Sequence, residues 1–139
     1  MDNFFDGFGI KSGEILHVTP KETLELCKKG AVLVDVREDY LNRFKIFDVD
    51  ELIFCPLSIL ADSYNDLPQN KPLIFADAVG LRSKEAVQFL QLKEITNIAN
   101  MAGGIVGWER SQLPIVIDES ERLTGSCLCM LRLRDRKKK

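Results

Sequence analysis

The stretch Pro72-Leu73-Ile74-Phe75-Ala76-Asp77-Ala78-Val79-Gly80-Leu81-Arg82-Ser83 contains an apolar run, a short loop and the start of a helical pattern. The apolar run ends at Asp77, one glycine lies in the loop, and Arg82 and Ser83 open the helical segment. A strand, a tight loop and a helix N-terminus in this order gather backbone N–H groups around an anion. The stretch therefore predicts an anion-binding loop at the carboxyl end of a buried strand.

Apolar runs and amphipathic segments alternate along the rest of the chain. Besides 73–76, strands are expected at 15–18, 31–36, 52–55 and 95–100, and helices at 20–29, 83–92 and 105–110. Thr19, Pro20 and Glu22 predict the start of the first helix, with Thr19 as N-cap and Glu22 closing a capping box. This alternation predicts an α/β fold with a mainly parallel sheet of about five strands and helices on both faces.

Charged side chains at two strand ends form the candidate site, because ligands of parallel sheets bind beyond the carboxyl ends of strands. Asp77 follows one strand, and Asp35 and Arg37 end another. We expect the Asp77 carboxylate to accept N–H groups of residues 79–82 and so to fill the anion site itself. Arg82 is expected to brace the loop by pairing with a carboxylate, with Asp35 and Arg37 in the same network; the alternative is that Arg82 binds a substrate anion.

The composition is typical of one globular domain, with 139 residues, 45% hydrophobic residues and 29% charged residues. No apolar run approaches the roughly 20 residues that span a bilayer, and the acidic N-terminus lacks the order of a secretory signal. A cytoplasmic location is therefore expected. We predict an N-terminal arm at 1–14 that docks through its phenylalanines, a domain at 15–115, and a C-terminal tail at 116–139.

The tail carries two features of its own. From Met130 onward it has six Lys or Arg and one Asp, a pattern that is compatible with nucleic acid or an anionic membrane but is also typical of a solvated chain end. Cys127 and Cys129 point to the same side of an extended segment, so they could form a redox couple, carry a persulfide, share a soft metal with another chain, or have no chemical role. A zinc site needs two more ligands than the tail offers, so neither a metal nor a cofactor is expected.

Several motifs of the chain resemble those of the rhodanese homology domain, in the family's order. They are Val18–Glu22 for its first helix, Leu33–Arg37 for its Asp-x-Arg strand, Gly80–Ser83 for its active loop, Ala99–Trp108 for its Gly-Gly and Trp segment, and Leu113–Pro114 for its exit. The resemblance spans Leu16 to Pro114 and implies the fold of a sulfurtransferase.

The chain departs from the family's pattern at the position that carries the chemistry. The resemblance places the sulfur-carrying cysteine at position 77, where this chain has aspartate, and the family's Gly-His-Ile segment is missing from 41–54. The spacing from Asp77 to Arg82 is that of the sulfurtransferase loop, and one residue shorter than the loop of phosphatases that share the fold. The vestigial active-site loop would thus consist of Asp77, Ala78, Val79, Gly80, Leu81 and Arg82.

A carboxylate cannot carry a transferable sulfur, because sulfur transfer needs a polarizable thiolate. We therefore expect a non-catalytic module that binds a protein partner or a small anion. The alternative is a sulfurtransferase or thiol-redox enzyme that uses Cys127 and Cys129, which are close in sequence to the arginines of the tail. Incubation with a sulfane donor, followed by mapping of the added sulfur by mass spectrometry, would distinguish the binding module from the enzyme.

Overall fold

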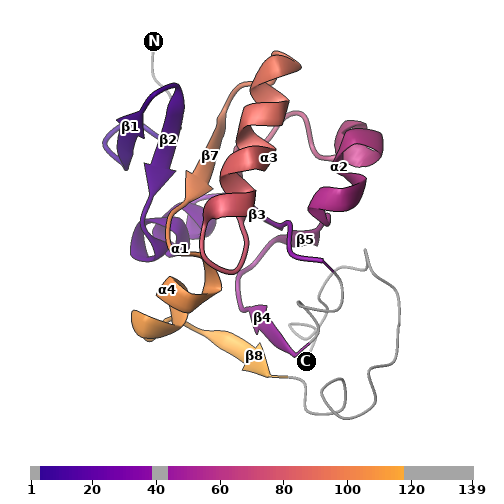
Figure 1. Ribbon diagram of the computed structural model, residues 1–139. Coiled ribbons are helices and arrows are strands. Elements are labelled where there is room, and N and C mark those ends of the chain that lie inside the picture. Colours follow the sequence, from indigo (N-terminus) through magenta and orange to yellow (C-terminus); the bar gives the residue numbers. More distant parts are fainter. Residues whose placement is uncertain (1–3, 39–43, 118–139) are drawn as a thin grey trace.

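A six-stranded sheet forms the centre of the protein, as seen in the computed structural model, which describes residues 4–38 and 44–117. Its order is β1-β2-β7-β6-β3-β5. The strands are, in that order, β1 (Ile10–Ser12), β2 (Ile15–Val18), β7 (Ile98–Met101), β6 (Leu73–Ala76), β3 (Val32–Asp35) and β5 (Leu52–Phe54). All neighbours are parallel except β1, which pairs antiparallel with β2. The predicted mainly parallel sheet is confirmed, with β1 added at its edge (Figure 1).

Four α-helices connect and cover the strands: α1 (Pro20–Lys28), α2 (Leu57–Ser63), α3 (Leu81–Leu92) and α4 (Gly104–Arg110), with a 3₁₀ turn at Tyr64–Asp66. Thr19 and Glu22 form the predicted capping box of α1. The start of α2 has no cap of its own. Instead the Glu38 carboxylate accepts bonds from the Ser58 N–H at 3.1 Å and the Ser58 hydroxyl at 2.7 Å. That cap is tertiary, because the two residues lie 20 positions apart.

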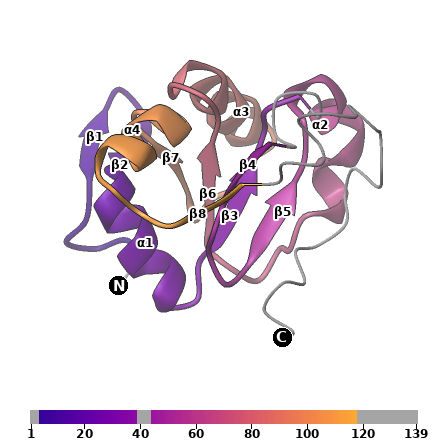
Figure 2. The same ribbon diagram turned by 90° about the horizontal axis from the view of Figure 1, so that it is seen from below.

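Alternate residues of the central strands enter two apolar clusters on opposite faces of the sheet. Leu33 and Ile74 belong to the cluster that also contains residues of α1 and α4, whereas Val34 and Phe75 belong to the cluster with residues of α2 and α3. Figure 2 shows α1 with α4 on one side and α2 with α3 on the other. Strands covered on both faces read as continuous apolar runs, which is the pattern of 31–36 and 73–76.

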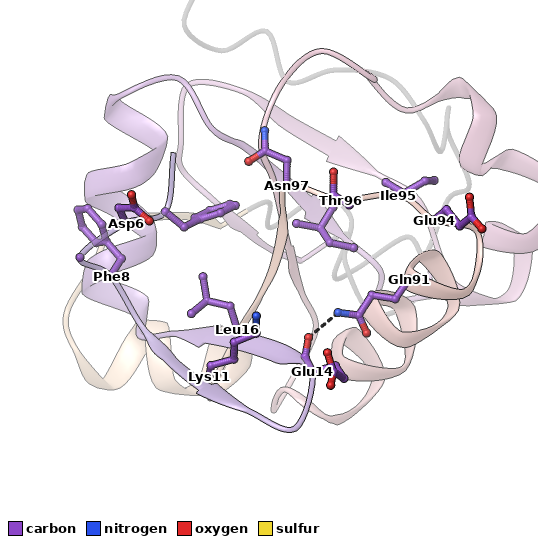
Figure 3. A pocket seen from close by; sticks show the side chains of 13 residues that line it. Asp6, Phe8, Lys11, Glu14, Leu16, Gln91, Glu94, Ile95, Thr96 and Asn97 are labelled. Carbon is purple, nitrogen blue, oxygen red and sulfur yellow. Dashed lines mark hydrogen bonds between the residues drawn. The ribbon is translucent and has the colours of Figure 1, made fainter. Parts of the chain in front are cut away.

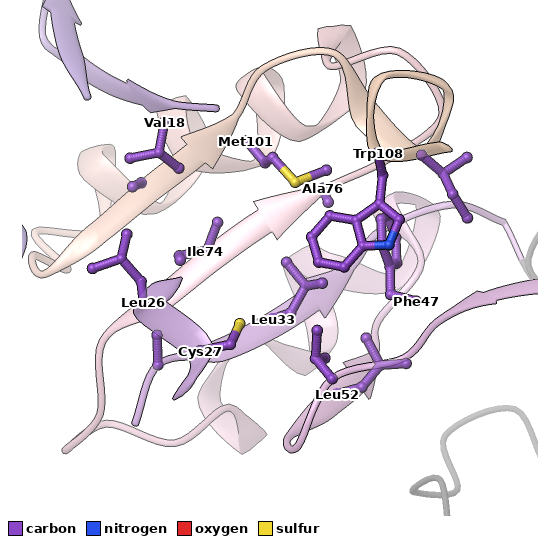
Figure 4. Packing of buried hydrophobic residues seen from close by; sticks show 14 of the residues in the cluster. Val18, Leu26, Cys27, Leu33, Phe47, Leu52, Ile74, Ala76, Met101 and Trp108 are labelled. Carbon is purple, nitrogen blue, oxygen red and sulfur yellow. The ribbon is translucent and has the colours of Figure 1, made fainter. Parts of the chain in front are cut away.

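A second, two-stranded sheet was not predicted. It pairs β4 (Lys45–Phe47) antiparallel with β8 (Ile115–Ile117). Trp108 joins it to the core: its indole N–H donates to the Pro114 carbonyl at 2.7 Å, and its ring meets Phe47 edge-on with 5.2 Å between centroids (Figure 4). Three-residue strands that pair about 70 positions apart leave no periodic signal in the sequence.

Two boundaries differ from the expectation. Residues 10–12, placed by the sequence in an irregular arm, form β1, while Phe5 is buried and Phe4 and Phe8 pack against the core. The strand expected at 95–100 begins only at Ile98, because the chain after α3 turns through left-handed backbone at Glu94 and Asn97. Among the described residues no helix is long and apolar enough to cross a membrane. The boundaries at 14 and 115 stay predictions.

Candidate functional site

The loop after β6 closes around the carboxylate of Asp77. This residue is buried, with 2% of its surface exposed. Oδ1 accepts the Gly80 N–H at 2.5 Å, and Oδ2 accepts the Arg82 N–H at 3.0 Å. Gly80 is the N-cap of α3, has φ +101°, and has no side chain with which to cap the helix. Asp77 therefore supplies the capping oxygens from three residues upstream, next to the positive end of the helix dipole.

A chain of buried polar side chains leads from this carboxylate across the sheet. The Ser83 hydroxyl lies 3.2 Å from Oδ1 of Asp77 and 2.5 Å from Oδ1 of Asn100. The side-chain nitrogen of Asn100 lies 3.0 Å from Nδ1 of His17. Burial lowers the pKa of His17, and the positive charge of Lys84 adds to the effect. This series of polar side chains links Asp77 to the half-buried His17 on β2.

The start of α4 packs directly on the loop and holds its backbone. The Ile105 N–H donates to the Asp77 carbonyl at 2.8 Å, and the Val106 N–H donates to the Ala78 carbonyl at 3.1 Å. Gly104 has φ +58°, and a Cβ at this position would lie 2.2 Å from the Ala78 carbonyl carbon. Glycine is therefore required where the two backbones meet.

The charged residues predicted to brace this loop are arranged differently. Arg37 pairs with Asp35 at 2.8 Å and donates to the Lys45 carbonyl at 2.7 Å, so the buried pair ties β3 to β4. Neither residue hydrogen bonds to Asp77 or Arg82. The Arg82 guanidinium is exposed and makes no hydrogen bond or ion pair within the described residues. The expectation that Arg82 braces the loop through a carboxylate is therefore wrong for the described part of the chain.

The outer side of the loop is apolar. Val79 is 52% exposed, Leu81 is 68% exposed, and Val106 on α4 is 39% exposed. The bond from the Val106 N–H to the loop places these residues on neighbouring segments. We call Val79, Leu81, Arg82 and Val106 the loop rim. Large apolar side chains that are exposed together are a common mark of protein contact surfaces.

The thiols of the described core are poor nucleophiles. Burial, followed by the charges of Asp50 and Glu51, raises the pKa of Cys27 to about 12. Burial, followed by the charge of Asp66, raises the pKa of Cys55 to about 11. Both thiols are therefore protonated at neutral pH. Cys127 and Cys129 lie outside the described residues.

The chain also matches a known protein family. The model of the Rhodanese-like domain matches residues 19–111. The chain belongs to this family. Thiosulfate sulfurtransferase GlpE of Haemophilus influenzae is 30% identical over 102 residues, which cover 70% of this chain and 91% of the relative.

Solved structures agree with the fold. A rhodanese-related protein from Thermoplasma volcanium superimposes with a TM-score of 0.65 at 28% identity, covering 73% of this chain and 98% of that one. A NAD-dependent persulfide reductase from A. fulgidus gives a TM-score of 0.50 at 26% identity, covering 56% of this chain but only 14% of that longer chain. The similarity thus spans almost all of the first structure but only a small part of the second.

Sequence reasoning found Asp77 and its loop but missed Ser83, Asn100 and His17 as members of one network. The available signal was Asn100, a polar residue within the otherwise apolar strand β7. A buried amide needs hydrogen-bond partners, so its presence implied polar neighbours. Their identity depends on the pairing of β2 with β7, which places His17 beside Asn100.

Proposed function

We propose that this rhodanese-like domain does not carry sulfur at its active-site loop and acts instead as a binding module. The observation that carries the proposal is the position of the Asp77 carboxylate, which accepts hydrogen bonds from the N–H groups of Gly80 and Arg82. The resemblance to the rhodanese family places the sulfur-carrying cysteine at this position. In a sulfurtransferase such donors lower the energy of a thiolate. Here they are occupied by a group that cannot hold a transferable sulfur.

The loop rim supports a protein as the partner. Its apolar members Val79, Leu81 and Val106 are exposed at the mouth of the loop, and the neighbouring Arg82 guanidinium makes no bond within the described residues. Apolar side chains beside one arginine fit a partner surface that presents apolar residues and a carboxylate. A small anion would use Arg82 alone. A cytoplasmic location stays a prediction from the sequence.

The decisive experiment asks whether the protein takes up sulfur. The full chain is incubated with thiosulfate, and added sulfur is mapped by mass spectrometry of unreduced peptides. We expect no persulfide on the wild-type protein. A persulfide on Cys127 or Cys129, formed with turnover, would refute the proposal and establish the tail cysteines as the catalytic thiols.

The variant Asp77→Cys tests whether the loop alone explains the loss. Its thiolate should attack the sulfane sulfur of thiosulfate, take it up as a persulfide and release sulfite. Asp77→Ser is the matched control, because serine is similar in size to cysteine but has no thiol. This variant should take up no sulfur. A folded Asp77→Cys protein without persulfide would show that the loop lacks more than its nucleophile.

The rim is tested by site-specific crosslinking. A photoreactive residue at Leu81 should give a defined adduct with a partner, and Arg82→Ala should weaken it. The same residue at Leu92, which is 83% exposed at the far end of α3, is the control. Equal adducts from both positions would refute the rim as the contact surface.

A further inference from the structure

A cavity of about 480 Å³ lies beside the N-terminal segment, away from the Asp77 loop (Figure 3). One wall comes from residues 5–16 and the other from residues 91–98. The second wall leads into the start of β7, whereas Asp77 follows the end of the parallel strand β6. The cavity and the Asp77 loop are therefore at opposite ends of the sheet, and the two can bind independently.

The cavity has the size of a small-molecule site, and it combines a mainly polar lining with five apolar side chains. Ligand sites in proteins typically enclose about 300–1,000 Å³. Its apolar lining comes from Phe5, Phe8, Leu16, Ile95 and Ile98. Phe5 is buried and the other four are half-buried, so these side chains are already held by the core while part of their surface faces the opening.

A hydrogen bond joins the two walls of the cavity. The Gln91 side-chain N–H donates to the Glu14 carbonyl at 2.6 Å, which joins the end of α3 to the turn between β1 and β2. This bond is drawn as the dashed line in Figure 3. The bond holds the two walls together, so less ordering is needed on binding.

The polar groups at the opening have a net negative charge. Asp6, Glu14 and Glu94 line it together with one cation, Lys11. The carboxylates of Glu14 and Glu94 make no hydrogen bond or ion pair with any described residue. Carboxylates beside apolar side chains in one cavity favour a ligand with a positive head and an apolar body.

Glu94 adds an observation that is independent of the charge. It occupies the position after the end of α3 in left-handed backbone with φ +63°, where the Ile95 N–H closes the helix on the Leu90 carbonyl at 3.0 Å. Glycine is the common residue at this position because any Cβ is strained there. The chain thus holds a carboxylate at the cavity in a backbone conformation that disfavours it.

We propose that this cavity binds a small organic cation, with the apolar body against Phe8, Leu16 and Ile95 and the ammonium group facing Glu14 and Glu94. The ligand class is a primary amine on an aromatic or branched apolar body. This site does not depend on the function proposed for the Asp77 loop.

The test uses the full chain and the probe 4-phenylbutylamine, titrated while backbone amide shifts are followed by NMR. A fragment of this size should bind with a dissociation constant on the order of millimolar and shift the amides of residues 6–16 and 94–98. The uncharged analogue 4-phenylbutanol should bind about tenfold more weakly, because it leaves the carboxylates without a cation. Equal affinity for the alcohol, or shifts elsewhere, would overturn the proposal.

Two variants separate the charge from the fold. Glu94→Gly should weaken the amine about two- to fivefold, as expected for one exposed charge pair, yet raise the melting temperature by a few degrees because the left-handed strain is relieved. Lys11→Gln should strengthen binding by a similar factor. Glu85→Gln, on the exposed part of α3 and not among the lining residues, is the control and should change neither quantity. Unchanged amine affinity in both Glu94→Gly and Lys11→Gln would refute the assignment.

Discussion

Replacing Asp77 by alanine should open the anion site that its carboxylate now fills. The variant removes an oxygen acceptor from the Gly80 N–H and another from the Arg82 N–H, and it removes the neighbour of the Ser83 hydroxyl. Hydrogen bonds to charged groups contribute about 1.5–3 kcal/mol each, and loss of an N-cap costs about 0.5–2 kcal/mol. Arg82 is exposed, so water can replace part of the loss. We expect a destabilisation of about 2–3 kcal/mol.

The assay is urea unfolding followed by the fluorescence of Trp108, which is fully buried in the fold and so reports its loss. Asp77→Asn retains one acceptor oxygen and should lose about half as much free energy of unfolding. Asp62→Ala removes the same charge from an exposed position and should stay within about 0.5 kcal/mol of wild type.

Anion rescue distinguishes an opened site from a merely damaged loop. Thiosulfate or sulfate that binds only the folded Asp77→Ala protein raises its stability by RT ln(1 + [L]/Kd), about 2.7 kcal/mol at a hundredfold excess over Kd. Sodium chloride at the same ionic strength controls for general salt effects. The reasoning is refuted if Asp77→Ala loses less than about 1 kcal/mol, or if the divalent anions stabilise wild type and variant equally.

Three further predictions follow from other contacts. Because burial lowers the pKa of His17 from its usual 6.5, the unfolded chain binds the proton more readily; stability should be highest above about pH 6.5 and fall as the pH drops through the lower, folded value, and His17→Gln should flatten this slope in urea melts at pH 5 to 8. Arg37→Ala leaves Asp35 buried without its ion-pair partner and should cost about 3–5 kcal/mol, measured by thermal unfolding, with Arg37→Lys recovering only part. Gly104→Ala would place a Cβ 2.2 Å from Ala78 and should lower the melting temperature by more than 5 °C, which is about 1–2 kcal/mol for a chain of this size.

The local elements could be predicted because their signals are local. The capping box at Thr19 depends on residues within four positions, and the apolar run 73–76 reads as a strand covered on both faces. The Asp77 loop was also within reach, since its donors belong to the residues that immediately follow it. In these places short-range geometry and sequence spacing carry the same information.

The brace and the polar network were out of reach for the opposite reason. Arg37 is held by Asp35 and by the carbonyl of Lys45 on β4, and β4 pairs with β8 from about 70 positions further along the chain. The half-buried His17 reaches Asn100 because β2 and β7 are neighbours in the sheet. No spacing in the sequence encodes which strands are neighbours, since strand order follows from the packing of the whole chain.

The sequence by itself therefore determined the alternation of strands and helices, the family resemblance, and the presence of a carboxylate in a loop of N–H donors. Only the tertiary structure decided what that carboxylate contacts across the sheet, that Arg82 is left exposed beside an apolar rim, and that an acid-lined cavity forms at the other end of the fold. The physical reason is that hydrogen-bond partners and cavities belong to pairs of segments far apart in the chain. Their contact is set by the register and order of the sheet, whereas a helix cap or a strand–loop–helix turn is complete within a few residues.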